Sequence, residues 1–169
     1  MQSSTSLNPN EVRIYTDGSA HYKTGVGAWA FVAVYPDGKE EKKCKSYQVV
    51  TNNKMELCAV LEALDYIIKL EKPEEQGKRY SFQIISDSEY VVNGVTDWRH
   101  KWKLKNWKDV KNLPLWLAVD TALAALADMG LEVKFSWVRG HAGDKYNEVV
   151  DKLAHGEYKK LTDALNKRT

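Results

Sequence analysis

Two stretches of the sequence share a pattern that restricts how the chain can fold, because each resembles a β-strand that runs into an acidic residue. In Val12–Ser19 (VRIYTDGS), apolar and polar residues alternate before Asp17. Such alternation is typical of a strand with one buried face. Gly18 tolerates the backbone angles of a sharp turn, so we expect the strand to end at Asp17. The second stretch, Phe82–Ser88 (FQIISDS), repeats the arrangement at Asp87.

The segment between these stretches determines how the two strands are related. Apolar residues follow Asn53 at helical spacing, which indicates a helix packed on a sheet. We expect Asn53 to be its N-cap, with Glu56 three residues later as in a capping box. A strand–helix–strand crossover within one sheet makes the two strands parallel and the connection right-handed. Asp17 and Asp87 should therefore emerge at the same edge of the sheet.

The remaining segments complete one domain of the mixed α/β class. The 169 residues are one domain's worth of chain, which we place at residues 11–165 behind a frayed, polar tail at residues 1–10. We expect antiparallel strands at Val26–Tyr35 and Lys39–Val50, the second on a charged edge of the sheet, and a further strand at Leu131–Val138. The crossover helix should end at Lys72-Pro73, and a short helix should run from Ser88 to about Asn93. Pro114 should open a helix at Leu115–Met129, and a loop at Arg139–Asp144 should lead to a last helix from Asn147 to about Leu165.

Composition excludes several classes of protein. No apolar run approaches the ~20 residues of a membrane span, so we expect no membrane association. Cys44 and Cys58 lack metal-binding spacing and follow no secretory signal, which favours free thiols in a reducing cytoplasm. The net charge of +2 is too small to establish a polyanionic partner, so local clusters of charge must decide that question.

Four acids are expected to converge at the carboxyl ends of the strands, where open α/β sheets place their sites. Glu56 lies in the first turn of the crossover helix, and Asp151 lies in the first turns of the last helix. Together with Asp17 and Asp87, they would repel one another unless cations neutralised them. All-oxygen ligands suit Mg²⁺ or Mn²⁺ better than zinc, and two such ions would suit phosphodiester hydrolysis.

Each acid also has an ordinary interpretation. Glu56 could serve only as the capping-box partner of Asn53. Asp151 could be a first-turn acid favoured by the helix dipole, and Asp17 and Asp87 could be turn acids. The joint occurrence of the four acids is what favours a site.

His141 lies between glycines, close in sequence to Asp151. It could be a solvated loop residue. A mobile imidazole at this position could also move protons or help the product leave.

Four motifs occur in an order and spacing that resemble ribonuclease H of the bacterial type I form. The match extends over about Val12 to Leu161. Each motif alone is modest evidence for the family, but the four motifs and a fifth matching segment in the same order and spacing are specific for it. The motifs are YTDGS (Tyr15–Ser19), TNNKMEL (Thr51–Leu57), SDSEYV (Ser86–Val91) and WVRGHAG (Trp137–Gly143), and Asn147–Ala154 continues the match.

The resemblance implies a ribonuclease H-like fold, a five-stranded mixed sheet flanked by helices, and hydrolysis of the RNA strand of RNA–DNA hybrids. It implies two Mg²⁺ ions, replaceable by Mn²⁺, with His141 as an auxiliary loop histidine. The implied metal ligands are Asp17, Glu56, Asp87 and Asp151, and the residues implied to touch the hybrid are Thr51, Asn52 and Asn53.

Two departures from the family pattern affect what can be carried over. Many bacterial relatives have a glycine-rich run where this chain has the bulkier Ala20–Gly25. Glu89 stands where many relatives have Gln, and a carboxylate can accept but cannot donate a hydrogen bond. Contacts at both positions therefore stay open.

A basic segment with interleaved tryptophans spans Trp98–Lys111. It could be a solvated loop that its tryptophans anchor to the body of the protein. Its density of one charge also indicates a phosphate-binding surface, and it resembles the basic protrusion of the bacterial family. We expect nucleic-acid contacts from Arg99, Lys101, Trp102, Lys103, Lys105 and Lys108.

The sequence is thus interpreted as a monomeric, cytoplasmic, metal-dependent endoribonuclease that acts on RNA–DNA hybrids. Hydrolysis would leave 5′-phosphate and 3′-hydroxyl ends. Two alternatives are a hybrid-binding module without catalysis and a nuclease of the same fold with another nucleic-acid substrate. The presence of all four acids argues against the first alternative, and the basic segment argues against the second.

Overall fold

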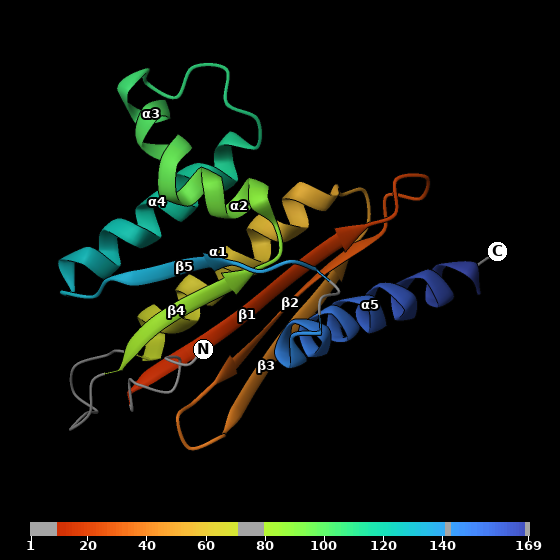
Figure 1. The fold of residues 1–169 in the computed structure, drawn as a ribbon. Coiled ribbons are helices and arrows are strands. Elements are labelled where there is room, and N and C mark those ends of the chain that lie inside the picture. Colours follow the sequence, from red (N-terminus) through yellow and green to blue (C-terminus); the bar gives the residue numbers. More distant parts are fainter. Residues whose placement is uncertain (1–9, 71–79, 141–142, 168–169) are drawn as a thin grey trace.

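The structure, a computed structural model, describes residues 10–70, 80–140 and 143–167. Its described strands form one five-stranded sheet in the order β3-β2-β1-β4-β5 (Figure 1). The first three strands form an antiparallel meander, whereas β1, β4 and β5 run parallel, which confirms the predicted mixed sheet. The strands are β1 (Glu11–Ala20), β2 (Gly27–Val34), β3 (Glu40–Tyr47), β4 (Ser81–Ser86) and β5 (Val133–Trp137).

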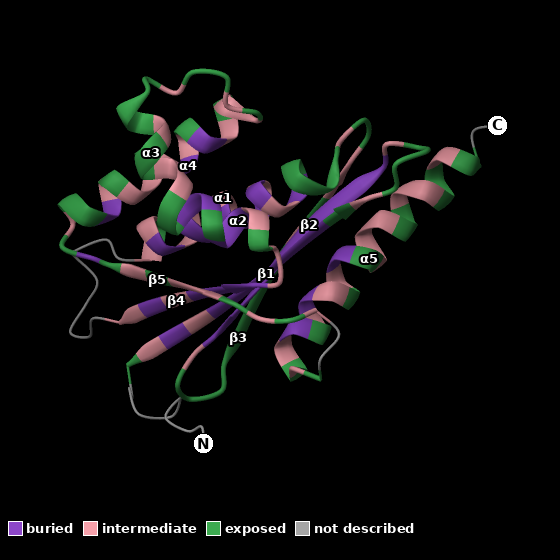
Figure 2. Cartoon of the chain, turned by 45° about the horizontal axis from the view of Figure 1, so that its top comes forward, coloured by how far each residue is buried: buried purple, intermediate pink, exposed green. Residues whose placement is uncertain are grey.

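Helices cover both faces of the sheet (Figures 1 and 2). One buried cluster joins the sheet to α1 and α4 through residues such as Ile14, Leu64 and Trp116. A second, smaller cluster joins the opposite face to α5 through Tyr15 and Val150. The helical elements are α1 (Asn52–Leu70), α2 (Glu89–Asn93), the π-helical turn η3 (Gly94–Trp98), α3 (Arg99–Leu104), α4 (Leu113–Asp128) and α5 (Lys145–Asn166).

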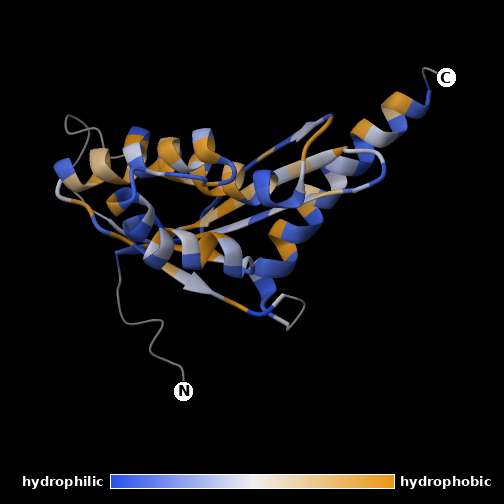
Figure 3. Ribbon diagram, turned by 90° about the horizontal axis from the view of Figure 1, so that it is seen from above, coloured by the Kyte–Doolittle hydropathy of each residue, from blue (hydrophilic) through white to orange (hydrophobic). Residues whose placement is uncertain are grey.

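Burial and hydropathy follow this layered arrangement. Every residue of β2 is buried, as expected for a strand covered on both faces, and Figure 2 shows buried residues along β1 and β2. In Figure 3 hydrophobic residues lie on the strands and in stripes on the helices, and hydrophilic residues alternate with them on the outer faces of the helices. The charged β3 forms the predicted edge. Among the described helices, none combines the length and the hydropathy that a membrane span requires.

The prediction that strand β1 ends at Asp17 was wrong. The strand continues to Ala20, which pairs with Gly27 of β2. Its pairing with β4, however, stops at Thr16, opposite Ser86. Asp17 is therefore the first residue of β1 beyond the end of β4. It lies at the edge of the sheet, as predicted, although β1 itself continues.

Gly18 allows close packing of α1 rather than a turn. A Cβ atom at this position would lie 2.3 Å from the carbonyl carbon of Met55 and 2.5 Å from the backbone nitrogen of Glu56. No side chain fits in that space. The missing side chain lets the first turn of α1 rest directly on β1, which brings Glu56 to the edge of the sheet.

Helix α1 begins at Asn52, so the prediction that Asn53 is the N-cap was wrong. The hydroxyl of Thr51 accepts a hydrogen bond from the backbone N–H of Lys54 (3.2 Å), which is the capping interaction. The side chain of Asn52 instead accepts from the backbone N–H of Ala20 (2.5 Å) and ties α1 to the end of β1. The capping-box role proposed for Glu56 therefore does not apply.

The helix after Ser88 is longer than predicted. It was expected to end near Asn93, but η3 and α3 continue it to Leu104. Gly94 directly follows the predicted end of this helix, and a Cβ atom there would lie 2.1 Å from the ring of Trp116. Gly94 thus admits the Trp116 ring against the helix. The predicted stop of α1 at Lys72-Pro73 lies outside the described residues.

Candidate active site

Three acids meet where β1, β4 and α1 come together. Asp17, Glu56 and Asp87 each offer one carboxylate oxygen, and these three oxygens lie within 4.8 Å of one another. The sequence predicted this meeting from the strand–helix–strand crossover. The acids converge from three separate elements, which is the arrangement expected of a site rather than of ordinary turn residues.

Asp151, the fourth predicted acid, reaches the cluster from α5. Its carboxyl group hydrogen-bonds the carboxyl group of Asp17. Odd-numbered residues of β1, such as Tyr15, face α5, and Asp17 shares that side of the strand. The structure thus brings all four predicted acids to one edge of the sheet, with Asp17 at the centre.

The electrostatics of the cluster show the cost of holding these carboxylates together. Asp17 is only 5% exposed. Burial, the negative charge of Asp87 and the hydrogen bond with Asp151 raise the pKa of Asp17 to about 8, although the Gly18 backbone opposes the shift. Burial, followed by the charges of Asp17 and Asp87, likewise raises the pKa of Glu56 well above its ordinary value.

Glu56 also shows that the cluster suits a cation. Its Oε1 atom is buried and has no hydrogen-bond partner among the described residues. A buried, unpaired carboxylate oxygen is costly, and a metal ion would satisfy it. The donor set consists of carboxylate oxygens, which fit Mg²⁺ or Mn²⁺.

The residues around Asp87 hold its backbone firmly. The Ser86 hydroxyl accepts from the backbone N–H of Ser88 (3.0 Å), and the Ser88 hydroxyl caps α2 by accepting from Val91 (3.2 Å). The indole N–H of Trp137 donates to the carbonyl oxygen of Asp87 (3.1 Å). A Cβ atom on Gly140 would lie 3.0 Å from Oδ2 of Asp87.

His141 lies outside the described residues, so its predicted role stays a prediction. The chain on either side of it is anchored. Val138 donates from its backbone to Ser86 (3.0 Å), and Asp144 caps α5 by accepting from Asn147 (3.0 Å).

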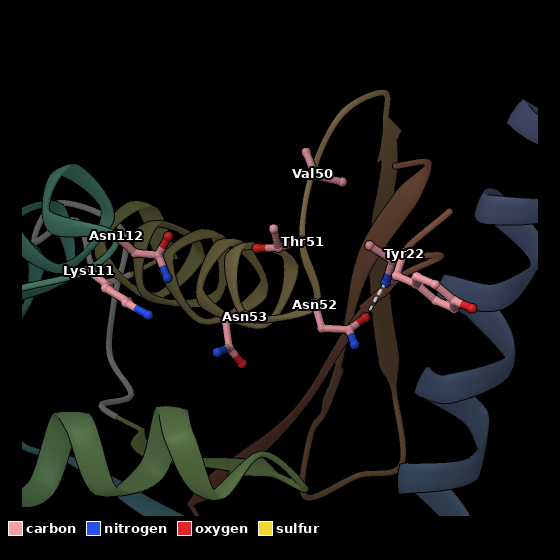
Figure 4. Close-up of a pocket in the computed structure, with 8 residues that line it drawn as sticks. Tyr22, Val50, Thr51, Asn52, Asn53, Lys111 and Asn112 are labelled. Atoms are coloured by element: carbon pink, nitrogen blue, oxygen red, sulfur yellow. Dashed lines mark hydrogen bonds between the residues drawn. The ribbon is translucent and has the colours of Figure 1, made fainter. Parts of the chain in front are cut away.

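A pocket of about 700 Å³ opens at the start of α1, beside the Ala20 end of β1 (Figure 4). The exposed Thr51, Asn52 and Asn53 line it, and Lys111 and Asn112 form its other wall. Figure 4 shows the side chains of Asn53 and Lys111 on the same side of α1, whereas the Tyr22 ring points away from the Asn52 carboxamide. Amide groups and an ammonium group suit a sugar–phosphate backbone.

The basic segment divides into residues that hold it and residues that are free to bind. Arg99 is mostly buried, with 13% of its side chain exposed, and its Nη1 lies 2.6 Å from Oδ1 of Asp120. Lys103 lies 2.8 Å from the same oxygen. Although burial opposes it, the hydrogen bonds from Lys103 and Arg99 lower the pKa of Asp120. This geometry argues against a phosphate contact from Arg99, which instead ties α3 to α4.

Other members of the basic segment are exposed or packed as their types suggest. Lys105 and Lys108 are exposed, and Lys101 is exposed 3.4 Å from Asp97. The Trp102 ring packs edge-on against Trp116 with centroids 5.1 Å apart. The predicted anchoring by tryptophan is thus present, and the lysines project from an anchored segment.

This arrangement defines a class of protein, namely mixed α/β folds whose site is a cluster of carboxylates suited to divalent cations. Comparisons with known proteins then specify the family. The RNase H family profile matches residues 9–159. The chain belongs to the ribonuclease H family, which is metal-dependent and acts on RNA–DNA hybrids, and it is a hydrolase of that family.

Similar proteins match over most of their length. A ribonuclease H of Ehrlichia chaffeensis is 42% identical over 153 residues, which cover 88% of this chain and 94% of the relative. A ribonuclease H of Treponema pallidum is 40% identical, covering 83% of this chain and 86% of that relative. The solved structure of LC9-RNase H1, a type 1 RNase H with the type 2 active-site motif, matches with a TM-score of 0.72 and 31% identity over 89% of this chain and 73% of that one.

Sequence reasoning missed the residues that support the acids. Gly18 was taken for a turn residue, and neither Trp137 nor Gly140 was assigned a role at Asp87. The available signal was the position of Trp137 and Gly140 directly after the strand that neighbours Asp87. That signal identifies neighbours, but it does not show which backbone groups they contact.

Proposed function

We propose that this chain hydrolyses the RNA strand of RNA–DNA hybrids with the help of two divalent cations, Mg²⁺ in the first place. The observation that carries the proposal is the set of three carboxylate oxygens that lie within 4.8 Å of one another. One of these oxygens belongs to Asp17, which is buried. Asp151 extends this set from α5. Asp17, Glu56, Asp87 and Asp151 would hold the cations.

The chemistry required at this site is the attack of water on a phosphodiester. A P–O bond forms to the water oxygen, the bond to the 3′ oxygen breaks, and the proton ends on that departing oxygen, which leaves 5′-phosphate and 3′-hydroxyl ends. Bound cations would supply a more acidic water and stabilise charge on the leaving oxygen. Mn²⁺ offers the same preference for oxygen ligands and would substitute.

The protein's own residues contribute orientation and proton transfer. The backbone N–H of Gly18 donates to the carboxylates of both Asp17 and Glu56, which orients two of the acids. His141, by its place between the last strand and α5, is proposed to carry a proton to or from the reacting groups. Loss of one limb of the pH–rate profile in His141→Ala would support that role, the acidic limb for a proton acceptor and the basic limb for a proton donor.

Two surfaces are proposed to bind the hybrid. Thr51, Asn52 and Asn53 would contact the sugar–phosphate backbones from the pocket at the start of α1. Lys101, Lys105 and Lys108 would contact phosphates farther along, with Lys103 shared between Asp120 and the substrate. Such recognition depends on groove shape and 2′-hydroxyls rather than on base identity, so cleavage should show no base sequence specificity. We propose that the chain acts as a monomer in the cytoplasm.

The decisive test is Asp87→Asn, which removes a charge that the cations require and nearly keeps the shape. We expect cleavage of a labelled RNA–DNA hybrid in Mg²⁺ to fall by roughly 10³-fold or more, the scale on which charge-stabilising groups act. Hybrid binding, measured by fluorescence anisotropy, should change little. Wild-type turnover by this variant would refute the assigned site.

A comparison of substrates separates this proposal from a nuclease of the same fold with another preference. RNA–DNA, RNA–RNA and DNA–DNA duplexes of one sequence should be offered to the same enzyme. Cleavage confined to the RNA strand of the hybrid is expected. Comparable cleavage of a DNA duplex would favour the alternative, and tight hybrid binding without cleavage would favour a silent binding module.

A further inference from the structure

The carbonyl oxygen of Asp87 is bound by a side chain from the neighbouring strand. Trp137 is the last residue of β5 and lies opposite Ser86 in the parallel register. Its indole N–H donates to the Asp87 carbonyl oxygen at 3.1 Å. The backbone N–H of Val138 also donates to the carbonyl oxygen of Ser86 at 3.0 Å. These two hydrogen bonds fix the end of β5 to the backbone of Ser86 and Asp87.

The exposure of Trp137 indicates that core packing is not its main role. Its relative exposure is 44%, whereas Trp29 and Trp116 are fully buried in the core. A tryptophan that is kept for packing normally buries most of its ring. The well-formed hydrogen bond to the backbone of an active-site acid is therefore the contact that distinguishes this position.

Gly140 closes the other side of Asp87. A Cβ atom on Gly140 would lie 3.0 Å from Oδ2 of Asp87, which is tighter than nine in ten real Cβ contacts, so the carboxylate would have to shift by a few tenths of an ångström. The carboxylate thus lies directly against the backbone of Gly140. Trp137 holds the main chain of Asp87, and Gly140 limits where its carboxylate can point.

We propose that Trp137 and Gly140 are positioning residues that keep the Asp87 carboxylate in place for the cations, an inference that rests on the proposed metal site. Neither residue touches the reacting atoms. Their effect is to hold the Asp87 oxygen within the 4.8 Å cluster with Asp17 and Glu56 before any cation arrives. Groups that orient ligands in this way set metal affinity and activity.

The test is Trp137→Phe, which keeps an aromatic ring and removes the N–H donor. We expect the Mg²⁺ concentration for half-maximal kcat to rise about tenfold, since supporting contacts of this kind alter metal affinity by 10–100-fold. KM for the hybrid, measured at saturating Mg²⁺, should change less than about twofold. Without substrate, the rise in Tm produced by Mn²⁺ should require a correspondingly higher Mn²⁺ concentration, which reports binding independently of turnover.

Gly140→Ala provides a second route to the same outcome by crowding Oδ2 of Asp87. It should shift the Mg²⁺ and Mn²⁺ midpoints in the same direction. The matched control is Phe135→Leu on the same strand, which lowers the stability of β5 without touching Asp87. Its Tm should fall in EDTA while its metal midpoints stay at the wild-type values.

The outcomes discriminate between this inference and the proposed function. Wild-type metal midpoints in both Trp137→Phe and Gly140→Ala would overturn the positioning role, as would an equal shift in Phe135→Leu. The site itself fails only if Asp87→Asn cleaves normally. A dead Asp87→Asn beside an unchanged Trp137→Phe would retain the site and discard only the positioning role.

Discussion

Glu56 and Asp17 approach the site from opposite faces of the sheet. Helix α1 covers the face on which Ile14 lies, whereas the side chain of Asp17 shares the face of Tyr15, which packs toward α5. The two carboxylates can meet only at the sheet edge, and only if α1 rests on β1 without an intervening side chain. Gly18 provides that contact, and its backbone N–H then serves both acids.

Gly18→Ala is expected to remove activity through geometry alone. Its Cβ would lie 2.3 Å from the carbonyl carbon of Met55, which is backbone and cannot swing aside. Helix α1 would have to move, at a cost typical of overpacking, about 1–3 kcal/mol or more. We expect a Tm lower by several degrees and loss of most cleavage in Mg²⁺, measured by thermal denaturation and a hybrid-cleavage assay.

Gly156→Ala is the matched control. Gly156 lies within α5, and no atom of the described chain outside its own helix turn comes within 4 Å of its added Cβ. Replacing a helical glycine by alanine should stabilise the protein by about 0.5–1 kcal/mol. Activity should stay at the wild-type value. Normal cleavage by Gly18→Ala would mean that the contact between α1 and β1 does not determine the position of Glu56.

The residue scale is also where sequence interpretation was least secure. Glycine permits both a sharp turn and a close approach of two backbones, and only the tertiary contact with α1 decides between them at Gly18. The same holds for Thr51 and Asn53, which are both good N-caps two positions apart. The acids were predictable because their positions after strands do not depend on such choices.

At the scale of elements, the segment from α3 to α4 is held by packing and presents its lysines outward. Four residues between α3 and α4 have left-handed backbone angles, with φ between 54° and 61°, and none of them is glycine. Such conformations persist only where the surroundings hold them. The Trp102 ring against Trp116 and the bond from the Trp107 backbone to the Trp102 carbonyl (2.8 Å) supply that support.

Removing the exposed charges should weaken binding and leave folding intact. In Lys105→Gln/Lys108→Gln, we expect KM for the hybrid to rise more than kcat falls, since binding is lost equally in the ground and transition states. Each lost phosphate contact should flatten the log–log salt dependence of binding by roughly 0.7–0.9. Binding titrations across a salt series measure this, and Tm should barely change.

Two comparisons control for the loss of charge and for packing. Lys42→Gln/Lys45→Gln makes the same change of charge on the edge strand β3 and should leave the salt slope unaltered. Trp102→Ala should lower Tm through lost packing. An unchanged slope in Lys105→Gln/Lys108→Gln would place the phosphate contacts on other residues.

The elements show where the sequence was sufficient and where it was not. The meander, the crossover helix and the edge strand follow from alternation and turn residues over long stretches. The extension from α2 through η3 to α3 was missed because Gly94 resembles a helix stop, whereas Trp116, twenty-two positions later, is what requires a glycine there. A constraint that comes from a distant residue leaves no local pattern.

At the scale of the whole molecule, the fold is assembled around a cluster of like charges that opposes it. Carboxylates roughly 4–6 Å apart repel by about 3–4 kcal/mol per pair at an effective dielectric near 20. The protein relieves the repulsion by protonation, which is why burial, Asp87 and Asp151 raise the pKa of Asp17 to about 8. Cations that bind the folded state alone would relieve the same repulsion and stabilise the fold.

Asp17→Asn should therefore melt higher than wild type in EDTA, and the difference should depend on pH. Between an unfolded pKa near 3.8 and a folded pKa of about 8, the native state holds a proton that the unfolded state lacks, so wild-type stability falls as pH rises through this window. The variant has no such group. The loss of wild-type stability between pH 5 and pH 8 amounts to about 4 kcal/mol, and 1 kcal/mol corresponds to roughly 2–4 °C at this size, so we expect the gap in Tm to widen by about 10 °C between pH 5 and pH 8. Added Mg²⁺ should narrow the gap at pH 8, because the wild-type site gains a ligand that the variant binds weakly.

Differential scanning calorimetry at pH 5 and pH 8, with and without Mg²⁺, measures Tm under all four conditions. The exposed Asp163→Asn on α5 serves as the control, and its Tm should not differ from that of wild type. Equal melting temperatures for wild type and Asp17→Asn at pH 8 in EDTA would mean that the acids do not repel one another in the folded protein.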